Sequence, residues 1–562
     1  MRRLSSTLTI SGLLIGVLIL AGLAAPMGVE RASSTSFIVQ AESLNAARLA
    51  VDRVGGTVTH ELGIINAVAA RLSAAERGEL EARDSLQISA NGLATIAAKG
   101  GKKNSAPPEE DLGAAPPEPD PEQSLELACG GRGGDKSWRE LRNEPYTWYP
   151  TQIGADALHD EGVTGEGVTI AVLDTGIYKV RAVSKDTSGE LRVLVGYDAI
   201  SDRRIKPMKW KDEKGHGSHV AATAVNSDTS ETDGRLNGVA PDADLVFVVA
   251  FDRDGLGNYA DIIRGIDWVV ANKDSYGIRV LNLSFSAPVQ SYYWEDPVAQ
   301  AVMAAWQAGI VVVTSAGNTG PDPMTIGVPG NVPHVITVGA TTDECTREDE
   351  SDDRLTSFSA AGPTYEGFVK PDLVAPGGHI NSIMDRLSWT AKDHPDFHDG
   401  GQYFMMSGTS QAAAVVSGVV ALMLQENPAL TPDEVKTRLM ITARPRVKED
   451  GTPAYSMFQQ GSGLVDAGAA VNAASLPYLF DDDVDPSACT SANCGLDVHL
   501  DLAGVEHYMG RARQAEDGTF YMDGLAWNDG LAWNDGLAWN DGLAWNDALT
   551  EPMSIDVWVE QE

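Results

Sequence analysis

Residues 165–176 read GEGVTIAVLDTG, and this stretch decides the fold. The apolar run 168–173 has the length of a buried strand, and it ends directly in Asp174 and a glycine turn. Similar apolar runs follow at 245–249, 280–283, 310–313 and 334–338, and helical patterns separate them at 219–226, 259–272, 297–307, 410–426 and 431–443. Near-continuous apolar strands joined by helices are typical of a parallel sheet covered on both faces. We therefore predict an α/β domain at 140–475 with a doubly wound, mostly parallel sheet.

The length and charge of the chain limit the classes of protein to which it can belong. It has 562 residues, more than one ordinary core needs, so two or more domains are expected. The formal net charge of −37 argues against nucleic acid as a partner, because phosphate binding needs a basic surface. The same charge suits a soluble extracellular protein.

The N-terminus has the pattern of an export signal. Arg2 and Arg3 precede an apolar run at 8–23, and small residues follow it. We interpret residues 1–25 as a cleaved signal peptide and expect a secreted protein, with association to the cell surface left open. A retained membrane anchor is the alternative, although the run barely approaches spanning length.

The four cysteines fit an oxidising compartment. Cys489 and Cys494 could close a short loop, which would leave Cys129 and Cys345 as the other pair. All three connectivities stay open on the sequence alone. No cysteine lies in a chemical motif, so we expect structural roles.

A small domain and a linker precede the α/β part. A strand pattern at 36–39, a helical pattern at 44–54, a turn into 57–62, and the segments 64–72 and 74–81 predict an α+β domain over 36–98. Residues 99–137 lose this periodicity and are rich in Pro and Glu, which is typical of a solvated linker. A peptidase would readily cut such a linker.

The region 476–562 is acidic and repetitive. It holds 18 Asp and Glu against two Arg, and the hexapeptide DGLAWN occurs four times over 523–546. Asn-Asp-Gly is a strong turn signal, so short turns between extended units are expected. One interpretation is a largely disordered, low-complexity tail. The other is a set of spaced tryptophans that bind a carbohydrate, a peptide, a polymer or a cell surface.

An acid and a base come first along the α/β part. Asp174 ends its strand, at the edge where α/β sheets build their sites. His216 lies between Gly215 and Gly217, ahead of a helix that we expect to begin near His219, and the glycines would leave its imidazole exposed. His219 itself is expected to be structural. Taken alone, Asp174 is better explained as a turn-capping residue, which is common after strands.

An amide and a hydroxyl follow in the same region. Asn318 closes the motif SAGN after an apolar strand, and Ser410 follows Gly408 and Thr409 at the start of a long apolar helix. A helix N-terminus stabilises negative charge on a hydroxyl oxygen, but the same position suits a plain N-cap serine. Asn318 could donate to an oxyanion or could be a loop residue. Together the four residues supply a nucleophile, a base, an orienting acid and an oxyanion donor.

Eight segments carry a resemblance to a known family: GEGVTIAVLDTGI, GHGSHVAAT, GVAPDADL, LNLSFS, SAGN, PDLVAPG, SGTSQAAAVVSGVVALML and GSGLVDAGAAV. In this order they resemble the subtilisin-type serine peptidases over about 330 residues. The resemblance implies that Asp174 orients His216, that His216 takes the proton of Ser410, and that Asn318 polarises the carbonyl oxygen. It also implies that residues 36–98 are an inhibitor-like propeptide, removed by cleavage in or near 98–137.

The sequence departs from the family pattern at Ser218, at Ser286 and in the segment 411–415 after the serine, which reads QAAAV. Ser218 replaces the usual Thr, Ala414 replaces a proline, and Ser286 stands where Gly is common. We expect the substrate to bind along Ser284, Phe285 and Ser286 and along Ser315, Ala316 and Gly317. A side chain at Ser286 would narrow this cleft.

We therefore expect a monomeric, secreted serine endopeptidase, made as a zymogen, that hydrolyses polypeptides through an acyl-enzyme and is inhibited by its own propeptide. The alternatives are a surface-binding protein whose tryptophan tail is the working part, and an acyl hydrolase that uses the same triad; SGTSQ is not the GxSxG elbow of esterases. No cofactor is expected for the chemistry, and no HExxH motif or His/Cys cluster occurs. Acid content and the resemblance favour structural calcium, with no ligands assigned.

Overall fold

The computed structural model describes residues 35–96 and 147–473, apart from 207–208, 231–232, 344–345, 347–349 and 449–452. It also describes four short strands farther on: β19 (Asp497–Leu500), β20 (Glu506–Met509), β21 (Ala512–Gln514) and β22 (Phe520–Met522). The predicted signal peptide, the linker, all four cysteines and the DGLAWN repeats lie outside the described residues.

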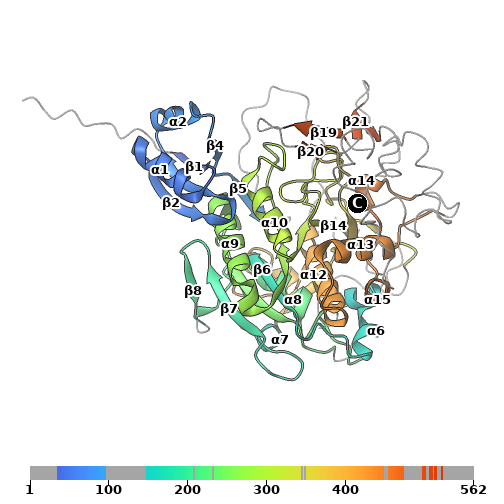
Figure 1. Ribbon diagram of the computed structural model, residues 1–562. Coiled ribbons are helices and arrows are strands. Elements are labelled where there is room, and N and C mark those ends of the chain that lie inside the picture. Colours follow the sequence, from blue (N-terminus) through green and yellow to red (C-terminus); the bar gives the residue numbers. More distant parts are fainter. Residues whose placement is uncertain are drawn as a thin grey trace, which may run out of the picture.

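A nine-stranded, mostly parallel sheet forms the centre of the molecule (Figure 1). Its strands are β6 (Thr169–Asp174), β7 (Val193–Asp198), β8 (Arg203–Ile205), β9 (Asp244–Val249), β11 (Ile278–Leu283), β13 (Val311–Ser315), β14 (Ile336–Thr342), β15 (Arg354–Leu355) and β16 (Leu373–Pro376). The order is β15-β14-β13-β11-β6-β9-β7-β8, and β16 pairs with β14. Only the pairs β7–β8 and β14–β15 are antiparallel. The predicted mostly parallel sheet is therefore confirmed.

Two pairs of long helices cover the sheet. Helices α8 (His216–Val225) and α12 (Thr409–Glu426) pack against each other, as do α9 (Tyr259–Tyr276) and α10 (Pro297–Gln307). Buried Asp296 caps α10 by accepting from the backbone N–H groups of Val298 and Ala299 at 2.8 and 2.9 Å. Further helices of the α/β part are α5 (Tyr149–Gln152), α6 (Ala155–Asp160), α7 (Arg181–Ser184), α13 (Pro432–Thr442), α14 (Met457–Gln460) and α15 (Ala467–Asn472).

The predicted helix at 297–307 is confirmed to the residue, but the one predicted from 219 is wrong at its start. Helix α8 begins at His216, because Gly215 adopts φ 99° as its N-cap and turns the chain directly into the helix. His216 is therefore a helical residue and not part of a preceding loop.

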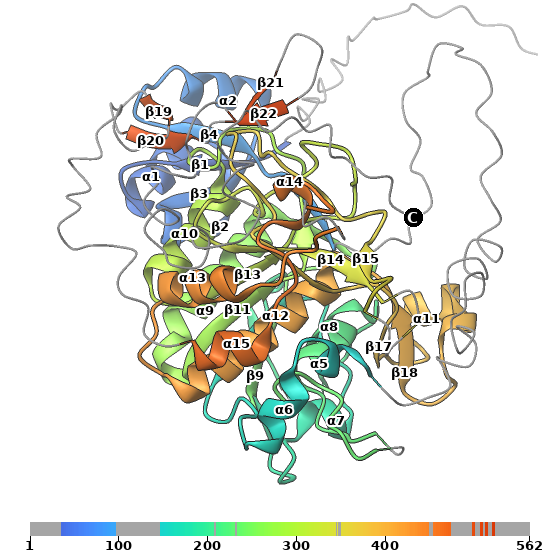
Figure 2. The same cartoon turned by 90° about the vertical axis from the view of Figure 1, so that its right-hand side faces the viewer.

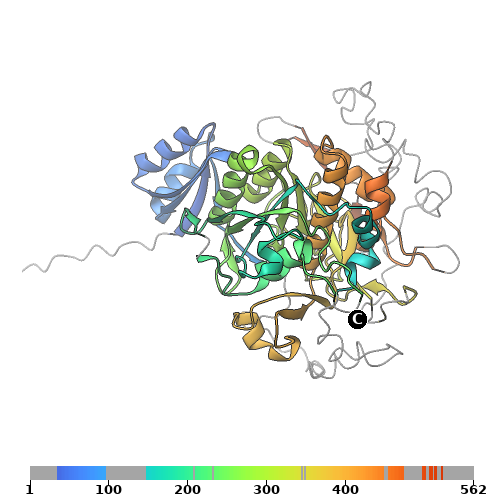
Figure 3. The same ribbon diagram turned by 90° about the horizontal axis from the view of Figure 1, so that it is seen from below.

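The N-terminal unit is a four-stranded antiparallel sheet of order β2-β3-β1-β4. It consists of β1 (Thr35–Gln40), α1 (Leu44–Val54), β2 (Thr57–Leu62), η1 (Gly63–Ile65), β3 (Ala67–Leu72), α2 (Ala74–Glu81) and β4 (Gln87–Ala90). Val39, Val51, Val68 and Leu80 are buried between the sheet and the helices. The unit lies at one end of the molecule, with β2 and η1 against α9 and α10 (Figure 3).

Strand β5 (Leu93–Ile96) leaves this unit and pairs with the rest of the chain. It forms the middle of a three-stranded antiparallel sheet, between β10 (Leu256–Asn258) and β12 (Phe285–Ser286). Thr95 lies opposite both Leu256 and Ser286. A segment far away in the sequence thus lies between two short strands of the α/β part.

A hairpin with a helical excursion projects from one side of the molecule (Figure 2). It comprises β17 (Ile380–Ile383), α11 (Trp389–Asp393), η3 (Pro395–Phe397) and β18 (Tyr403–Met406). Strands β17 and β18 pair antiparallel. Within the described residues, no helix has both the length and the apolar character to span a membrane.

Candidate active site

Asp174 and His216 form a buried pair at the carboxyl end of the sheet. The Nδ1 atom of His216 lies 2.8 and 2.9 Å from the two carboxylate oxygens of Asp174, and each side chain is 1% exposed. Asp174 also accepts the backbone N–H of Thr175 at 2.7 Å, as a turn-capping residue would. The capping role and the pairing with histidine therefore coexist.

The pairing fixes the hydrogen on the imidazole ring. A carboxylate facing Nδ1 requires Nδ1 to carry the hydrogen, which leaves Nε2 as an acceptor in the neutral ring. Nε2 is buried, and among the residues that the structure describes it has no hydrogen-bond partner. This tautomer is the one that a general base needs.

The glycines around His216 serve close packing and not exposure, so the expectation of an open frame is wrong. A Cβ atom on Gly217 would lie 2.4 Å from the carbonyl oxygen of Gly176 and 3.1 Å from Cβ of Asp174. Only a glycine lets the first turn of α8 come this close to the end of β6. That approach brings His216 within hydrogen-bond distance of Asp174.

Ser410 is the second residue of α12, and the N-cap is Gly408, which makes no side-chain capping bond. The interpretation of Ser410 as a plain N-cap is therefore wrong. Its Oγ donates to the carbonyl oxygen of Ser284 at 3.3 Å, and Ser284 Oγ donates back to the Ser410 carbonyl at 3.0 Å. Ser410 thus lies beside the end of β11.

A hydrogen bond between Gln411 and His219 connects the first turns of α12 and α8, close to Ser410 and His216. Gln411 Nε2 lies 3.3 Å from Nδ1 of His219, and both side chains are buried. The other ring nitrogen of His219 lies 2.9 Å from the carbonyl oxygen of Phe404. Burial lowers the pKa of His219 to about 3, so the ring is neutral, and the predicted structural role is confirmed.

Asn318 follows β13 and faces the start of α12. Its Oδ1 atom accepts the backbone N–H of Thr409 at 3.0 Å and the hydroxyl of Thr409 at 2.9 Å. These two bonds fix the orientation of the amide, so its NH2 group points away from Thr409. Thr409, the neighbour of Ser410, therefore sets the direction in which the NH2 group of Asn318 points.

The predicted substrate-binding residues lie together, and most of their side chains are buried. Ser284, Phe285, Ser315 and Ala316 have buried side chains, and Ser315 Oγ donates to the Phe285 carbonyl at 3.1 Å. The backbone of Phe285 and Ser286 pairs with β5.

Ser286 fills space next to two glycines. A Cβ on Gly327 would lie 2.1 Å from Ser286 Oγ, and one on Gly317 would lie 3.3 Å from it. The hydroxyl of Ser286 therefore lies close to the backbone of Gly317 and Gly327. The narrower cleft stays a prediction.

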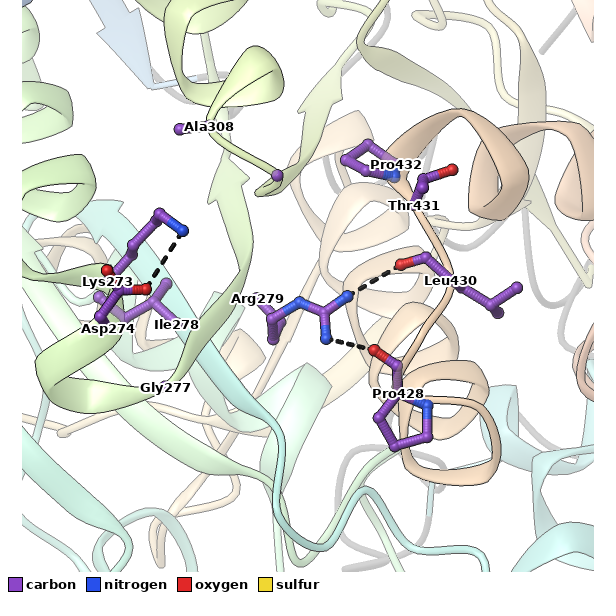
Figure 4. Close-up of a pocket in the computed structure, with 11 residues that line it drawn as sticks. Lys273, Asp274, Gly277, Ile278, Arg279, Ala308, Pro428, Leu430, Thr431 and Pro432 are labelled. Carbon is purple, nitrogen blue, oxygen red and sulfur yellow. Dashed lines mark hydrogen bonds and ion pairs between the residues drawn. The ribbon is translucent and has the colours of Figure 1, made fainter.

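A cavity of about 440 Å³ lies at the other end of the sheet. Arg279 extends across it and donates to the carbonyl oxygens of Pro428 and Leu430 at 2.7 and 2.9 Å (Figure 4). Ile278 starts strand β11, whereas Ser284 follows its last residue, so the length of the strand, about 20 Å, separates the cavity from Ser410. We assign no role in the chemistry to this cavity.

A family model described as the subtilase family matches residues 165–463. The chain belongs to the subtilase family. Serine protease AprX of Bacillus subtilis (strain 168) is 40% identical over 310 residues, which span 54% of this chain and 66% of that protein. Subtilisin E of the same organism is 33% identical over 324 residues, which span 57% of this chain and 70% of that protein.

A solved structure is also similar to this subtilase. Fervidolysin from Fervidobacterium pennivorans, a keratinolytic enzyme related to subtilisin, superposes with a TM-score of 0.57 and 22% identity, over 94% of this chain and 78% of that one. At this identity the likeness shows the fold alone. With the family match and the named serine proteases, the chain is a subtilisin-type serine endopeptidase, a hydrolase.

Subtilases need no cofactor for catalysis. Within the described parts of the chain, no cluster of three or more His, Cys, Asp or Glu could hold a metal ion. Structural calcium in this subtilase therefore stays a prediction without assigned ligands.

Sequence reasoning missed three residues around the site of this subtilase. Thr175 and Thr409 stand inside the motifs and could have been found as hydroxyl neighbours of Asp174 and Ser410. Asp212 lies in the charged run 211–214, and nothing in that run separates it from a solvated loop.

Proposed function

We propose that this subtilase cleaves polypeptides with Ser410 as nucleophile, His216 as general base and then acid, and Asp174 as the orienting carboxylate. Asn318 and the backbone N–H of Ser410 stabilise the oxyanion of the tetrahedral intermediate. The Asp174–His216 pair carries the proposal, because it leaves Nε2 of the imidazole as the acceptor for a hydroxyl proton. The mutual hydrogen bonds of Ser410 and Ser284 support it by holding the nucleophile at the same edge of the sheet.

A serine-directed fluorophosphonate tests the proposal. The protein freed of its N-terminal unit should be labelled at Ser410, and Ser410→Ala should lose both the label and proteolysis. Ser407→Ala, which changes a hydroxyl just ahead of α12, is the matched control and should keep both. Full proteolysis by Ser410→Ala would refute the assignment.

We further propose that the chain is a zymogen whose N-terminal unit inhibits it. Strand β5 supports this, because it pairs on both edges with β10 and β12 in the manner of an extended peptide. One register step beyond the Ile96–Phe285 pair is Ser284, whose carbonyl oxygen lies 3.3 Å from Ser410 Oγ. A processing bond soon after Ile96 would therefore reach the nucleophile.

Contacts outside β5 support the same proposal. His60 Nε2 lies 2.9 Å from Asp261, and Gly63 N–H donates to Asp267 at 3.0 Å. Asn91 accepts the backbone N–H of Ala260 at 2.9 Å. N-terminal sequencing of the protein and of Ser410→Ala is the test: we expect a new N-terminus after Ile96 in the first and an intact chain in the second.

The export signal, the secreted location and the monomeric state are proposed on the sequence. The acidic tail as a surface-binding element stays an alternative without structural support, because its repeats lie outside the described residues. Deletion of 523–546 tests it: loss of attachment to cells or polymers with unchanged peptide hydrolysis would establish a separate binding role.

A further inference from the structure

Asp212 is a buried carboxylate outside the Asp174–His216 pair. Its neighbours Lys211 and Glu213 are exposed and pair with each other, whereas Asp212 is 6% exposed. Burial raises the pKa of the Asp212 carboxyl, and hydrogen bonds from Gly215 and Ser218 act against that rise. Burying a carboxylate costs free energy unless hydrogen bonds compensate for the lost water.

Four hydrogen bonds to Asp212 give that compensation. Oδ1 accepts the hydroxyl of Thr175 at 2.9 Å and the backbone N–H of Gly215 at 2.7 Å. Oδ2 accepts the backbone N–H of Ser218 at 2.8 Å and its hydroxyl at 2.7 Å. All four partners are donors, so the site fits the ionised carboxylate. Gly215 is the N-cap of α8, and Ser218 lies in its first turn.

Thr175 connects Asp212 to Asp174. Its hydroxyl oxygen accepts the backbone N–H of Gly217 at 2.9 Å. The same oxygen lies 2.9 Å from Asp212 Oδ1 and 3.2 Å from Asp174 Oδ1, so both carboxylates are within reach of the hydroxyl hydrogen. Because the hydroxyl has one hydrogen, it can donate fully to only one of the two carboxylates. The shorter contact favours Asp212.

We propose that Asp212 is a positioning residue for catalysis, which holds the first turn of α8 with His216 and draws the Thr175 hydroxyl away from Asp174. Its hydrogen bonds to Gly215 and Ser218 hold the start of α8 and so set the position of the His216 imidazole. Because Asp212 also accepts the Thr175 hydroxyl, the carboxylate of Asp174 keeps only His216 Nδ1 and the Thr175 backbone N–H as its donors in this set of bonds. The proposal rests on the proposed roles of Asp174, His216 and Ser410.

Asp212→Asn disrupts these hydrogen bonds while keeping a side chain of the same size. Each oxygen of Asp212 accepts a backbone N–H that cannot turn away, from Gly215 and from Ser218. An amide has only one oxygen, so its NH2 group must face one of these N–H groups. The start of α8 shifts, and the Thr175 hydroxyl is released to donate to Asp174.

Steady-state kinetics on a chromogenic peptide, with the full chain allowed to mature, is the first test. We expect Asp212→Asn to lower kcat by about 10- to 100-fold, the usual loss for a group that orients a catalytic residue, with KM changed less than about threefold. Thr175→Val should lower kcat as well, and the double variant should lose less than the product of the two single losses.

Two matched variants separate positioning from mere stability. Glu213→Gln changes the adjacent exposed carboxylate and should leave kcat unchanged. Asp296→Asn changes another buried cap carboxylate, at the start of α10, and should lower the melting temperature while leaving kcat within about twofold.

The low-field proton resonance of His216 Nδ1–H is the second test, because it reports the Asp174–His216 bond directly. We expect it to shift in Asp212→Asn and to stay in place in Asp296→Asn. An unshifted resonance together with kcat within twofold of the wild type would overturn the proposal. Failure of the proposed function is distinguishable, since Ser410→Ala would then retain activity whatever Asp212 does.

Discussion

Gly217→Ala should reduce activity far more than its single methyl group suggests. The new Cβ would lie 2.4 Å from the carbonyl oxygen of Gly176, about 1 Å short of ordinary van der Waals contact. The clash partner is backbone, so helix α8 has to move, and His216 is its first residue. A displacement of about 1 Å between catalytic groups lowers the rate by about 10²-fold. Overpacking should also lower the free energy of unfolding by about 1–3 kcal/mol.

Gly468→Ala is the matched control, because Gly468 is likewise the second residue of its helix, α15. A Cβ there would come no closer than 3.6 Å to another atom. Both variants are assayed for kcat/KM on a chromogenic peptide and for thermal unfolding. If Gly217→Ala keeps more than a third of the wild-type kcat/KM, the view that this glycine exists for close approach is refuted.

Three further predictions follow from the described contacts. Asp174→Asn should lower kcat by about 10⁴-fold with a small change in KM, because the amide favours the wrong imidazole tautomer; steady-state kinetics measure this. Asn318→Ala should lower kcat by about 10²- to 10³-fold, the general effect of losing one oxyanion donor, and an equal rise in KM would contradict that role. Burial raises the pKa of Asp353 from its usual 3.8 to about 7, with Asp343 and Glu350 adding to the rise. The folded state therefore keeps a proton that the unfolded chain has lost, so this group makes the protein less stable as pH rises from about 4 to 7. Thermal unfolding should give Asp353→Asn a higher melting temperature than the wild type at pH 8 and the same melting temperature near pH 4.

The central fold could be predicted from the sequence because its signals are local. Strands such as β9 are continuous apolar runs, and helix α10 starts at an Asp-Pro pair and carries a regular apolar stripe. Strand β7, which lies next to the edge strand β8, gave no such signal. Strand β7 alternates only weakly, and its Gly196 is needed where the ring of Phe247 would lie 2.2 Å from an added Cβ.

Part of the site could not be predicted, because it depends on long-range pairing. Strand β5 has four residues, and its partners lie more than 150 positions away, so no local pattern marks it. Asp212 stands among charged neighbours and becomes distinct only when α8 folds over it. Asp174, His216, Asn318 and Ser410 could be found in the sequence because each lies at or after the end of a strand or in the first turn of a helix.

Strand β5 has a consequence for how the activity depends on dilution. While the chain is intact, β5 and its partner strands β10 and β12 belong to one molecule, so their pairing does not change with protein concentration. A cut beyond Ile96 turns the N-terminal unit into a separate partner held by contacts such as those at Asp261 and Asp267. The fraction of the enzyme that is bound by the cut unit then falls as the solution is diluted. With the inhibition proposed above, a freshly cut preparation should therefore gain specific activity on dilution.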